Sequence, residues 1–133
     1  MGASALSLEV QIRRVEALLL AGEVGEAVSC ASALQEHLAS DHAGNDEFIV
    51  QLEPLAGIAL ARVCRLDEAE ATLTRAVDRS AAAGNSYCAA IAWAGQAMVA
   101  AARGEDTSRA TEVAAELLGG LGIVGIPPVA RRI

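Results

Sequence analysis

The glycines at positions 120, 122 and 125 are the part of the sequence that most suggests cofactor chemistry. Their spacing matches the G-x-G-x-x-G string of dinucleotide-binding loops. Such a loop needs a strand before it and a helix after it, so that the N-terminus of the helix faces the pyrophosphate. Here a helical pattern precedes the glycines and Pro127-Pro128 follows them. We therefore expect these glycines to end a helix and turn the chain, and we expect no cofactor.

The two histidines, His37 and His42, offer a second kind of chemistry. Acidic side chains and Cys30 lie near them in the sequence, and imidazole, carboxylate and thiolate groups all bind metals. However, a spacing of five residues across the end of a helix does not place both rings on one face. Two solvated imidazoles beside a polar loop are the simpler interpretation, so a small metal-binding protein stays a remote alternative.

Catalytic motifs are absent from the sequence. No serine or cysteine has a base at the spacing of a nucleophile motif, and there is no phosphate-binding loop. The acidic pairs Asp46-Glu47 and Asp67-Glu68 stand where helices are expected to begin, and there carboxylates complement the helix dipole. Asp67 and Glu70 also have the spacing of a capping box. The sequence predicts a protein that is not an enzyme, with a small enzyme as a remote alternative.

The composition indicates one all-α domain. The chain has 133 residues, of which 53% are apolar but only 2% are aromatic, and it contains 30 alanines. Alanine has the highest helix propensity and lets neighbouring helices approach closely. The alternation of apolar and polar residues that is typical of strands does not persist. A core of small and medium aliphatic side chains between helices is expected.

Charge and cysteine content limit the possible partners and the compartment. The net charge is −7, and residues 1–60 hold nine acidic residues against two arginines. An acidic half repels nucleic-acid phosphates and anionic lipid, so we expect no nucleic-acid partner and no membrane partner. The three cysteines show no close pairing, and no signal-peptide or membrane-spanning pattern is visible. The sequence therefore predicts a cytoplasmic location.

A short phrase recurs along the chain and indicates a repeat. Ala27, Ala69 and Ala110 each open a new apolar pattern, at intervals of 42 and 41 residues. An interval of this size holds one helix pair, which is the mark of an α-solenoid. We predict an α-solenoid of about three antiparallel helix pairs over residues 4–120, followed by an extended C-terminal tail over residues 121–133.

Apolar spacing, glycine stops and caps place the six helices of this prediction. Asn45 and Asn85 are expected to be N-caps, and Pro54 is expected to kink the third helix or split off its first turns. The tail is expected to be packed on the last helix or free, and it could act as a linker or lie in the groove of another copy. The predicted helices cover about residues 4–21, 24–39, 46–64, 67–83, 86–103 and 107–118.

The second unit resembles a tetratricopeptide repeat. Gly57 stands midway along the first helix, Ala69 stands early in the second, and Leu73 and Ala76 follow one and two turns later. The third unit has Trp93, Ala97 and Ala110 in similar places, and the first unit has Ala27. In this resemblance Trp93 is a bulky packing residue between helices; in a binding surface it would be an anchor for a partner.

The interval differs from the usual one of about 34 residues, and longer units are typical of one group of regulators. Residues 61–69 and residues 114–124 are similar to the helical sensor region of large ATP-dependent LuxR-type, maltose-regulator-like transcription regulators. This resemblance implies a non-catalytic module that senses a ligand or a protein. The parent protein would carry an ATPase domain upstream and a helix-turn-helix domain downstream.

The resemblance also implies a binding groove lined by the first helix of each pair. The implied partner is a protein or peptide segment, or a small effector. The alternative is a stand-alone scaffold or oligomerisation adaptor, in which exposed terminal helices stack to form a homo-oligomer. The expected groove residues are Glu9, Ile12, Glu16, Gln51, Ile58, Arg62, Ile91 and Met98.

Overall fold

The computed structural model describes residues 5–40 and 45–131, and these residues form α-helices without any strand. The predicted all-α fold class is confirmed, and the predicted helix bounds are close to those found. The elements are α1 (Ala5–Leu20), α2 (Val24–Ser40), α3 (Asp46–Arg62), α4 (Leu66–Ala82), α5 (Ser86–Ala102), α6 (Ser108–Gly120) and the short 3₁₀ helix η1 (Pro128–Ala130).

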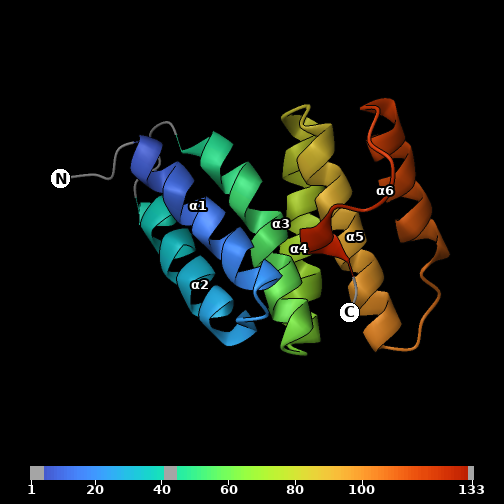
Figure 1. Ribbon diagram of the computed structural model, residues 1–133, viewed down its shortest axis with the longest axis horizontal. Helices are drawn as coiled ribbons and strands as arrows, with labels where there is room; N and C mark the ends of the chain where they lie inside the picture. The colour runs from blue at the N-terminus through green and yellow to red at the C-terminus, as the bar shows by residue number, and fades with distance from the viewer. Residues whose placement is uncertain (1–4, 41–44, 132–133) are drawn as a thin grey trace.

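Successive helices run antiparallel and stand side by side, from α1 and α2 at one end to α6 at the other (Figure 1). Each helix packs on the next, and the odd-numbered helices also contact one another, α1 with α3 and α3 with α5. Among the described residues, the even-numbered helices make no comparable contacts with each other. The odd-numbered helices therefore form a packed layer of their own, as in a helical solenoid.

The helices form three hairpins, α1/α2, α3/α4 and α5/α6, and the turns inside the first two share one design. At the end of α1, Gly22 has a φ of 81°, and the Glu23 N–H donates to the Leu18 carbonyl at 2.9 Å. This is the Schellman arrangement, which needs a left-handed residue just after the helix. The turn after α3 has the same hydrogen bonds, but the left-handed residue is Cys64, with a φ of 63°. A residue with a Cβ atom is strained in this conformation.

The tightest packing lies where α4 meets α3 and α5. The Leu73 side chain fills a space that exists because Gly57 and Gly95 have no side chains. A Cβ atom added at Gly57 would lie 2.5 Å from Leu73 Cγ, and one added at Gly95 would lie 2.7 Å from Leu73 Cδ2. Ala27 and Ala69, the two repeat alanines of α2 and α4, are fully buried. Small residues thus let the helices approach closely.

Trp93 and the third repeat alanine, Ala110, are less buried than Ala27 and Ala69. Trp93 is half-buried and packs against the hydrophobic core, in agreement with the packing interpretation. Ala97 and Ala110 are also half-buried. The third hairpin is consequently less closed than the second.

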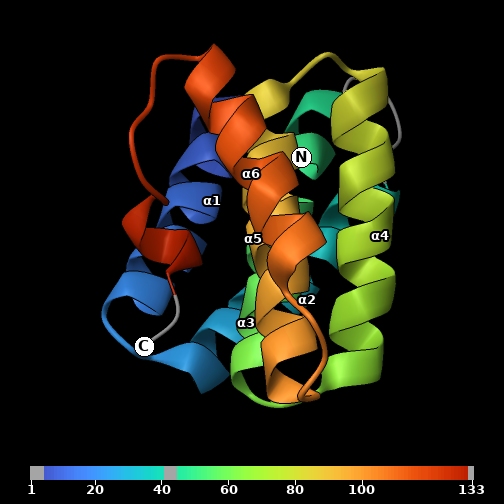
Figure 2. The ribbon, with the colours of Figure 1, turned by 90° about the vertical axis from the view of Figure 1, so that its right-hand side faces the viewer.

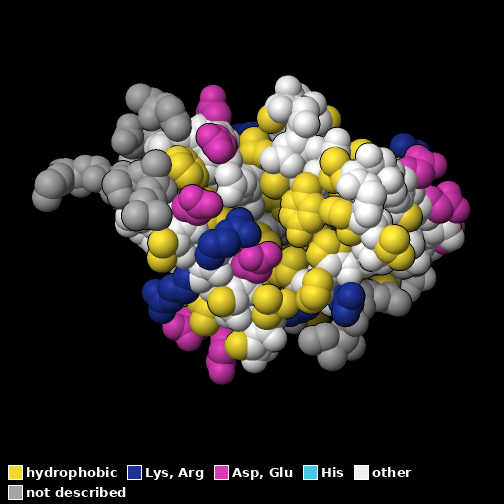
Figure 3. Space-filling view, turned by 45° about the horizontal axis from the view of Figure 1, so that its top comes forward, with side chains coloured by type: hydrophobic (Ala, Val, Ile, Leu, Met, Phe, Trp, Pro, Cys, Tyr) yellow, Lys and Arg dark blue, Asp and Glu magenta, His cyan; other side chains and the backbone are white. Residues whose placement is uncertain are grey.

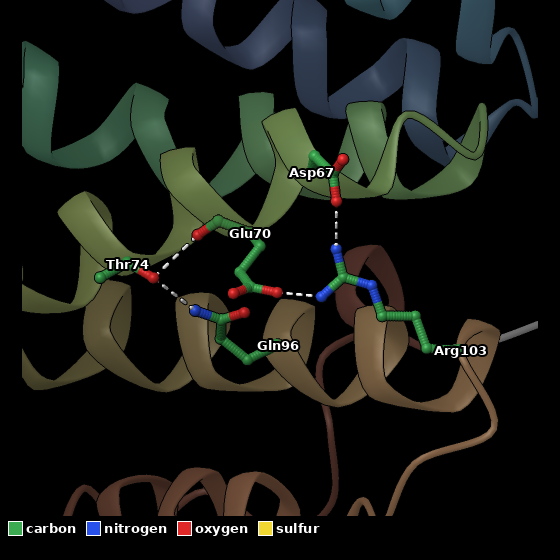
Figure 4. Close-up of polar contacts among 5 residues, drawn as sticks. All are labelled: Asp67, Glu70, Thr74, Gln96 and Arg103. Carbon is green, nitrogen blue, oxygen red and sulfur yellow. Dashed lines mark hydrogen bonds and ion pairs between the residues drawn. The ribbon is translucent and has the colours of Figure 1, made fainter.

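Two local predictions need correction. The carboxylates of Asp67 and Glu70 form no capping box, because α4 begins at Leu66 and both accept hydrogen bonds from the guanidinium of Arg103, just after α5 (Figure 4). The hydrogen bond that Arg103 donates to Glu70 is the largest of the interactions that raise the pKa of Arg103. The α3 helix is not split, since it continues through Pro54 to Arg62. By contrast, Asn85 caps α5 as expected, accepting from the Cys88 N–H at 3.0 Å.

A buried acid lies next to Pro54 on α3. Glu53 is buried, and its Oε2 accepts from Arg79 of α4 at 3.1 Å and lies 3.6 Å from Arg75. Its Oε1 has no hydrogen-bond partner. Burial raises the pKa of Glu53, although the two arginines act in the opposite direction. This acid holds α3 to α4 at some cost in desolvation.

Candidate binding groove

The face formed by α1, α3 and α5 carries a cavity of 390 Å³, which we call the Tyr87 cavity. Its floor is apolar, and its walls carry charged and hydrogen-bonding groups. A cavity of this size with an apolar floor and a few polar groups is typical of a ligand or peptide site. It is lined by Glu9, Arg13 and Glu16 of α1; Gln51, Pro54 and Leu55 of α3; Asn85, Tyr87, Cys88 and Ile91 at the start of α5; and Val129 of η1.

Charge and burial differ across this cavity. On the α1 wall, Arg13 donates to Glu16 at 2.9 Å. On the α5 wall, the Tyr87 side chain is 39% exposed, and burial together with the nearby Glu16 carboxylate raises the pKa of its hydroxyl. Burial likewise raises the pKa of the Cys88 thiol. Figure 3 shows apolar side chains gathered in a hollow of the molecule, with acidic and basic side chains beside them. Tyr87 can therefore offer both an apolar ring and a hydrogen-bonding hydroxyl to a partner.

Two further cavities adjoin the same face. The Arg62 cavity, of 710 Å³, lies among Gly22, Val24, Ala61, Arg62, Met98, Ala101 and Ala102. The Ala97 cavity, of 430 Å³, lies among Ala94, Ala97, Thr107, Thr111, Ala114, Ile126, Ala130 and Arg131.

Six of the eight groove residues expected from the sequence line these cavities. Glu9, Glu16, Gln51 and Ile91 line the Tyr87 cavity. Arg62 and Met98 line the Arg62 cavity.

The structure corrects the expectation for the other two, Ile12 and Ile58. Both are 0% exposed and belong to the core between the helix layers, so neither side chain can contact a partner in the groove. Each lies on a face of its helix that is rotated away from the groove, although its spacing from groove residues is helical. Spacing alone does not distinguish these two faces of a helix that is buried on both sides.

Sequence reasoning missed several residues of the Tyr87 cavity, including Arg13, Tyr87, Cys88 and Val129. A signal existed for two of them. Arg13 follows Glu9 by four residues and Tyr87 precedes Ile91 by four, and residues at this spacing share a helix face. Val129 had no such signal, because its position depends on where the tail folds back.

The course of the tail differs from the predicted one, in which the tail packs on α6 or is free. Figure 1 and Figure 2 show it leaving the end of α6, turning back across the molecule and placing η1 beside α1 and α5. Gly122 and Gly125 make the reversal, with φ values of 77° and 82°. Val129 and Ala130 are buried there. The tail therefore occupies part of the α1/α3/α5 face.

Arg62 fixes the tail to the hairpins. Its Nη1 donates to the Leu19 carbonyl at 2.8 Å, and its Nη2 donates to the carbonyls of Val129 at 3.4 Å and Arg131 at 3.1 Å. Burial lowers the pKa of Arg62 from its ordinary value. One guanidinium thus joins the end of α1, the end of α3 and the tail.

The structure places the glycine string and one of the two histidines. Gly120 ends α6, no strand precedes the string within residues 45–131, and only the 3₁₀ helix η1 follows it. His37 is exposed on α2, and His42 lies outside the described residues. Among the residues that the structure describes, no three His, Cys, Asp or Glu side chains are grouped so as to hold a metal ion.

No helix in the described part of the chain combines the length and the apolar character needed to span a membrane. Comparison with protein-family models, with curated proteins and with solved structures gave no match. The function must therefore be argued from the groove itself.

Proposed function

We propose that this chain is a non-catalytic helical-repeat binding module whose α1/α3/α5 face takes an extended protein or peptide segment. The observation that carries the proposal is the Tyr87 cavity, because its three helical walls come from the first helix of each hairpin. Its apolar floor can take an aliphatic side chain of a partner, while Glu9, Glu16 and Gln51 can bond to polar groups along the partner backbone.

The wider role follows from the family resemblance and is part of the proposal. In it, the module is the sensing part of a cytoplasmic LuxR-type transcription regulator, and other domains of the regulator hydrolyse ATP and bind DNA. Two features support a partner that is a protein or peptide segment. The face is longer than a single small-molecule pocket, and its cavities follow one another along the helices.

Peptide selection followed by mutation tests this proposal. Peptides selected from a random library against the full chain are measured for affinity against Tyr87→Ser and Glu16→Arg variants. Residues at the centre of an interface typically contribute about 2 kcal/mol or more, so we expect about thirtyfold weaker binding for Tyr87→Ser. The matched control is Glu36→Arg, the same charge reversal on the exposed face of α2, and it should leave affinity within about twofold.

Peptides whose affinity falls with Glu36→Arg but is unchanged by both groove variants would show that the partner surface lies on the even-numbered helices. Circular dichroism and the thermal midpoint of each variant exclude misfolding as the cause.

A second candidate is an oligomerisation adaptor. It is favoured by Val10 and Leu20, two large apolar side chains that α1 leaves exposed at the end of the stack. If this role is correct, light scattering should show association at high concentration, and Val10→Glu should abolish it while leaving peptide binding in the groove intact.

A further inference from the structure

The C-terminal tail sits in the groove in the way that a bound peptide would. It arrives after an exposed reversal, in which Val124 is 100% exposed, and then becomes buried, with Val129 and Ala130 only 3% and 4% exposed. The tail is thus buried at residues 129–130, whereas its connection at Val124 is exposed. This is the pattern of a short ligand segment on an exposed linker.

A side chain of the groove, that of Arg62, binds the backbone of the tail. Arg62 donates to two tail carbonyls, those of Val129 and Arg131. Pro127 has φ and ψ of −55° and 147°, and Arg131 has −79° and 140°, so both residues adopt the polyproline II conformation. Between them the chain forms the 3₁₀ turn η1, in which the N–H groups of Ala130 and Arg131 donate to the carbonyls of Pro127 and Pro128 at 3.0 and 3.2 Å. The two carbonyls that accept from Arg62 lie outside these internal bonds.

The side chains of the tail enter the cavities on either side of it. Val129 is one wall of the Tyr87 cavity, while Ile126 and Ala130 are walls of the Ala97 cavity. The cavities continue beyond these side chains, so the tail fills only part of the groove. A partner segment that also reaches Tyr87 and Ile91 can gain contacts that the tail does not make.

We propose that residues 126–131 are a built-in ligand of the groove, and that the partner is a segment of the same chemistry, which displaces them. The partner segment would carry two prolines, then a branched apolar residue and a small residue. The carbonyl of the branched residue and that of the residue after the small one would accept from Arg62, as those of Val129 and Arg131 do. This inference rests on the proposed function, because it names the kind of peptide that the same groove takes.

The tether makes the tail an effective competitor even if its own contacts are weak. A short flexible linker gives a tethered ligand an effective concentration in the millimolar range. The tail therefore lowers the apparent affinity of any partner for the groove, and only a segment with extra contacts can replace it. In this way the intact chain discriminates against weak, proline-containing sequences.

A peptide with the sequence of residues 125–131, labelled with fluorescein, tests the proposal by fluorescence anisotropy. We expect it to bind a chain that ends at Val124 at least about tenfold more tightly than the full chain, in which the tail competes. Substitution of Asp for Val129 in the peptide should remove binding, since it would place a charge in an apolar cavity.

A matched pair of arginine variants locates the site. Arg62→Gln in the shortened chain should weaken peptide binding by about tenfold or more, because hydrogen bonds from a charged donor are lost. Arg65→Gln is the control, since Arg65 pairs with Glu68 and makes no hydrogen bond to the part of the tail that the structure describes. It should leave the affinity within about twofold.

The proposal is overturned if the peptide binds the full and the shortened chains equally, or if Arg62→Gln and Arg65→Gln have the same effect. It is also overturned if the full chain forms a dimer that disappears on shortening, because the tail would then serve a second copy. If library peptides bind in the groove while the tail peptide does not, this inference alone fails; if neither binds, the proposed function fails with it.

If circular dichroism shows that the shortened chain does not fold, the same proposal can be tested with a protease site inserted at Val124. The full chain folds first and is then cut, and the severed segment should stay associated until an excess of the unlabelled peptide displaces it. A severed segment that leaves at once and does not rebind contradicts the proposal.

Discussion

The second and third hairpins use the same two repeat positions in different ways. In the second hairpin the positions hold Gly57 and Leu73, and the large side chain fits where the glycine leaves room. In the third hairpin they hold Ala97 and Ala114, and both of these alanines line the Ala97 cavity. We call the interface between the two helices of a hairpin its seam. The seam of the second hairpin is filled by its own side chains and is closed in this sense, whereas the seam of the third hairpin leaves a space that the tail partly fills.

The first hairpin adds a third solution, with Val15 and Ala31 at the same positions, both buried in the core. There the large residue is on the first helix and the small one is on the second, the reverse of the second hairpin. The comparison shows that one large and one small residue complete a hairpin, on either helix. With two small residues, another segment is needed, and here the tail supplies Ile126 and Ala130.

The largest expected effect on stability comes from removing the large side chain in the seam of the second hairpin. Leu73→Ala should lower the free energy of unfolding by about 2–5 kcal/mol, because it leaves a cavity between two glycines that cannot fill it. Urea unfolding of the wild type and the variant measures the difference. A loss below about 1 kcal/mol would mean that the helices collapse into the space and that the seam is not closely packed.

Exchanging the sizes of Gly57 and Leu73 tests whether the first and second hairpins are equivalent. Gly57→Val alone should cost about 1–3 kcal/mol, since its side chain would collide with Leu73. Gly57→Val combined with Leu73→Ala copies the Val15 and Ala31 pair into the second hairpin. The double variant should lose at least about 1 kcal/mol less than the sum of the single variants, as expected of residues in contact. Additive losses would contradict the equivalence of the two hairpins.

A leucine should be tolerated in the third seam but not in the second. Ala69→Leu, like Ala27→Leu, should cost about 1–3 kcal/mol because these alanines lie in a closed seam. Ala114→Leu should cost at least about 1 kcal/mol less than Ala69→Leu, since the added atoms can enter the Ala97 cavity. Thermal unfolding of the variants in one buffer measures the difference, and equal losses would show that this cavity is not open to an α6 side chain.

The turns of the two hairpins give a smaller contrast. Cys64→Gly in the second hairpin should stabilise the fold by about 1 kcal/mol, because glycine adopts a positive φ without strain. Gly104→Ala, at the matching turn of the third hairpin, should destabilise it by a similar amount of about 1 kcal/mol. Unfolding midpoints that move in the same direction for both variants would contradict the shared turn design.

The smallest effect concerns Glu53, a buried acid that the second hairpin contains. Its pKa is raised from the ordinary 4.5, so between that value and the raised one the folded state binds more protons than the unfolded state. The contribution of Glu53 to stability is therefore greatest below about pH 4.5 and falls as the pH rises through the raised value. Arg75 and Arg79 face this acid from α4.

Comparison with Glu53→Gln isolates this effect from other carboxylates. The stability of the wild type relative to the variant should decline as the pH increases from 4 to 7. Glu36→Gln, at an exposed position of α2, is measured in parallel as the control for the loss of a carboxylate. A relative stability that rises with pH would mean that the arginines outweigh the cost of burial.

Much of the fold could be predicted because its signals are local. Apolar residues at helical spacing and glycines at helix ends placed the six helices, and the spacing of Ala27 and Ala69 predicted two positions that proved to be buried. The left-handed Cys64 gave no signal, because the residue type argues against the conformation it adopts.

The groove could be predicted only in part. Helical spacing identified Glu9, Glu16, Gln51 and Ile91, but it could not separate the groove from the core at Ile12 and Ile58. The course of the tail could not be predicted at all, since it depends on contacts between Arg62 and carbonyls about 70 residues further along the chain. Backbone carbonyls carry no sequence signature.

The most direct test of the account is a nuclear Overhauser measurement on the methyl groups of Val129 in the full chain. We expect contacts from these methyls to side chains of α1 and α5, among them Ile91. An isotope-filtered mixture of labelled and unlabelled chains should show no such contacts between molecules. Val129 methyls with random-coil shifts and no contacts to these helices would contradict it, as would contacts that arise only between two chains.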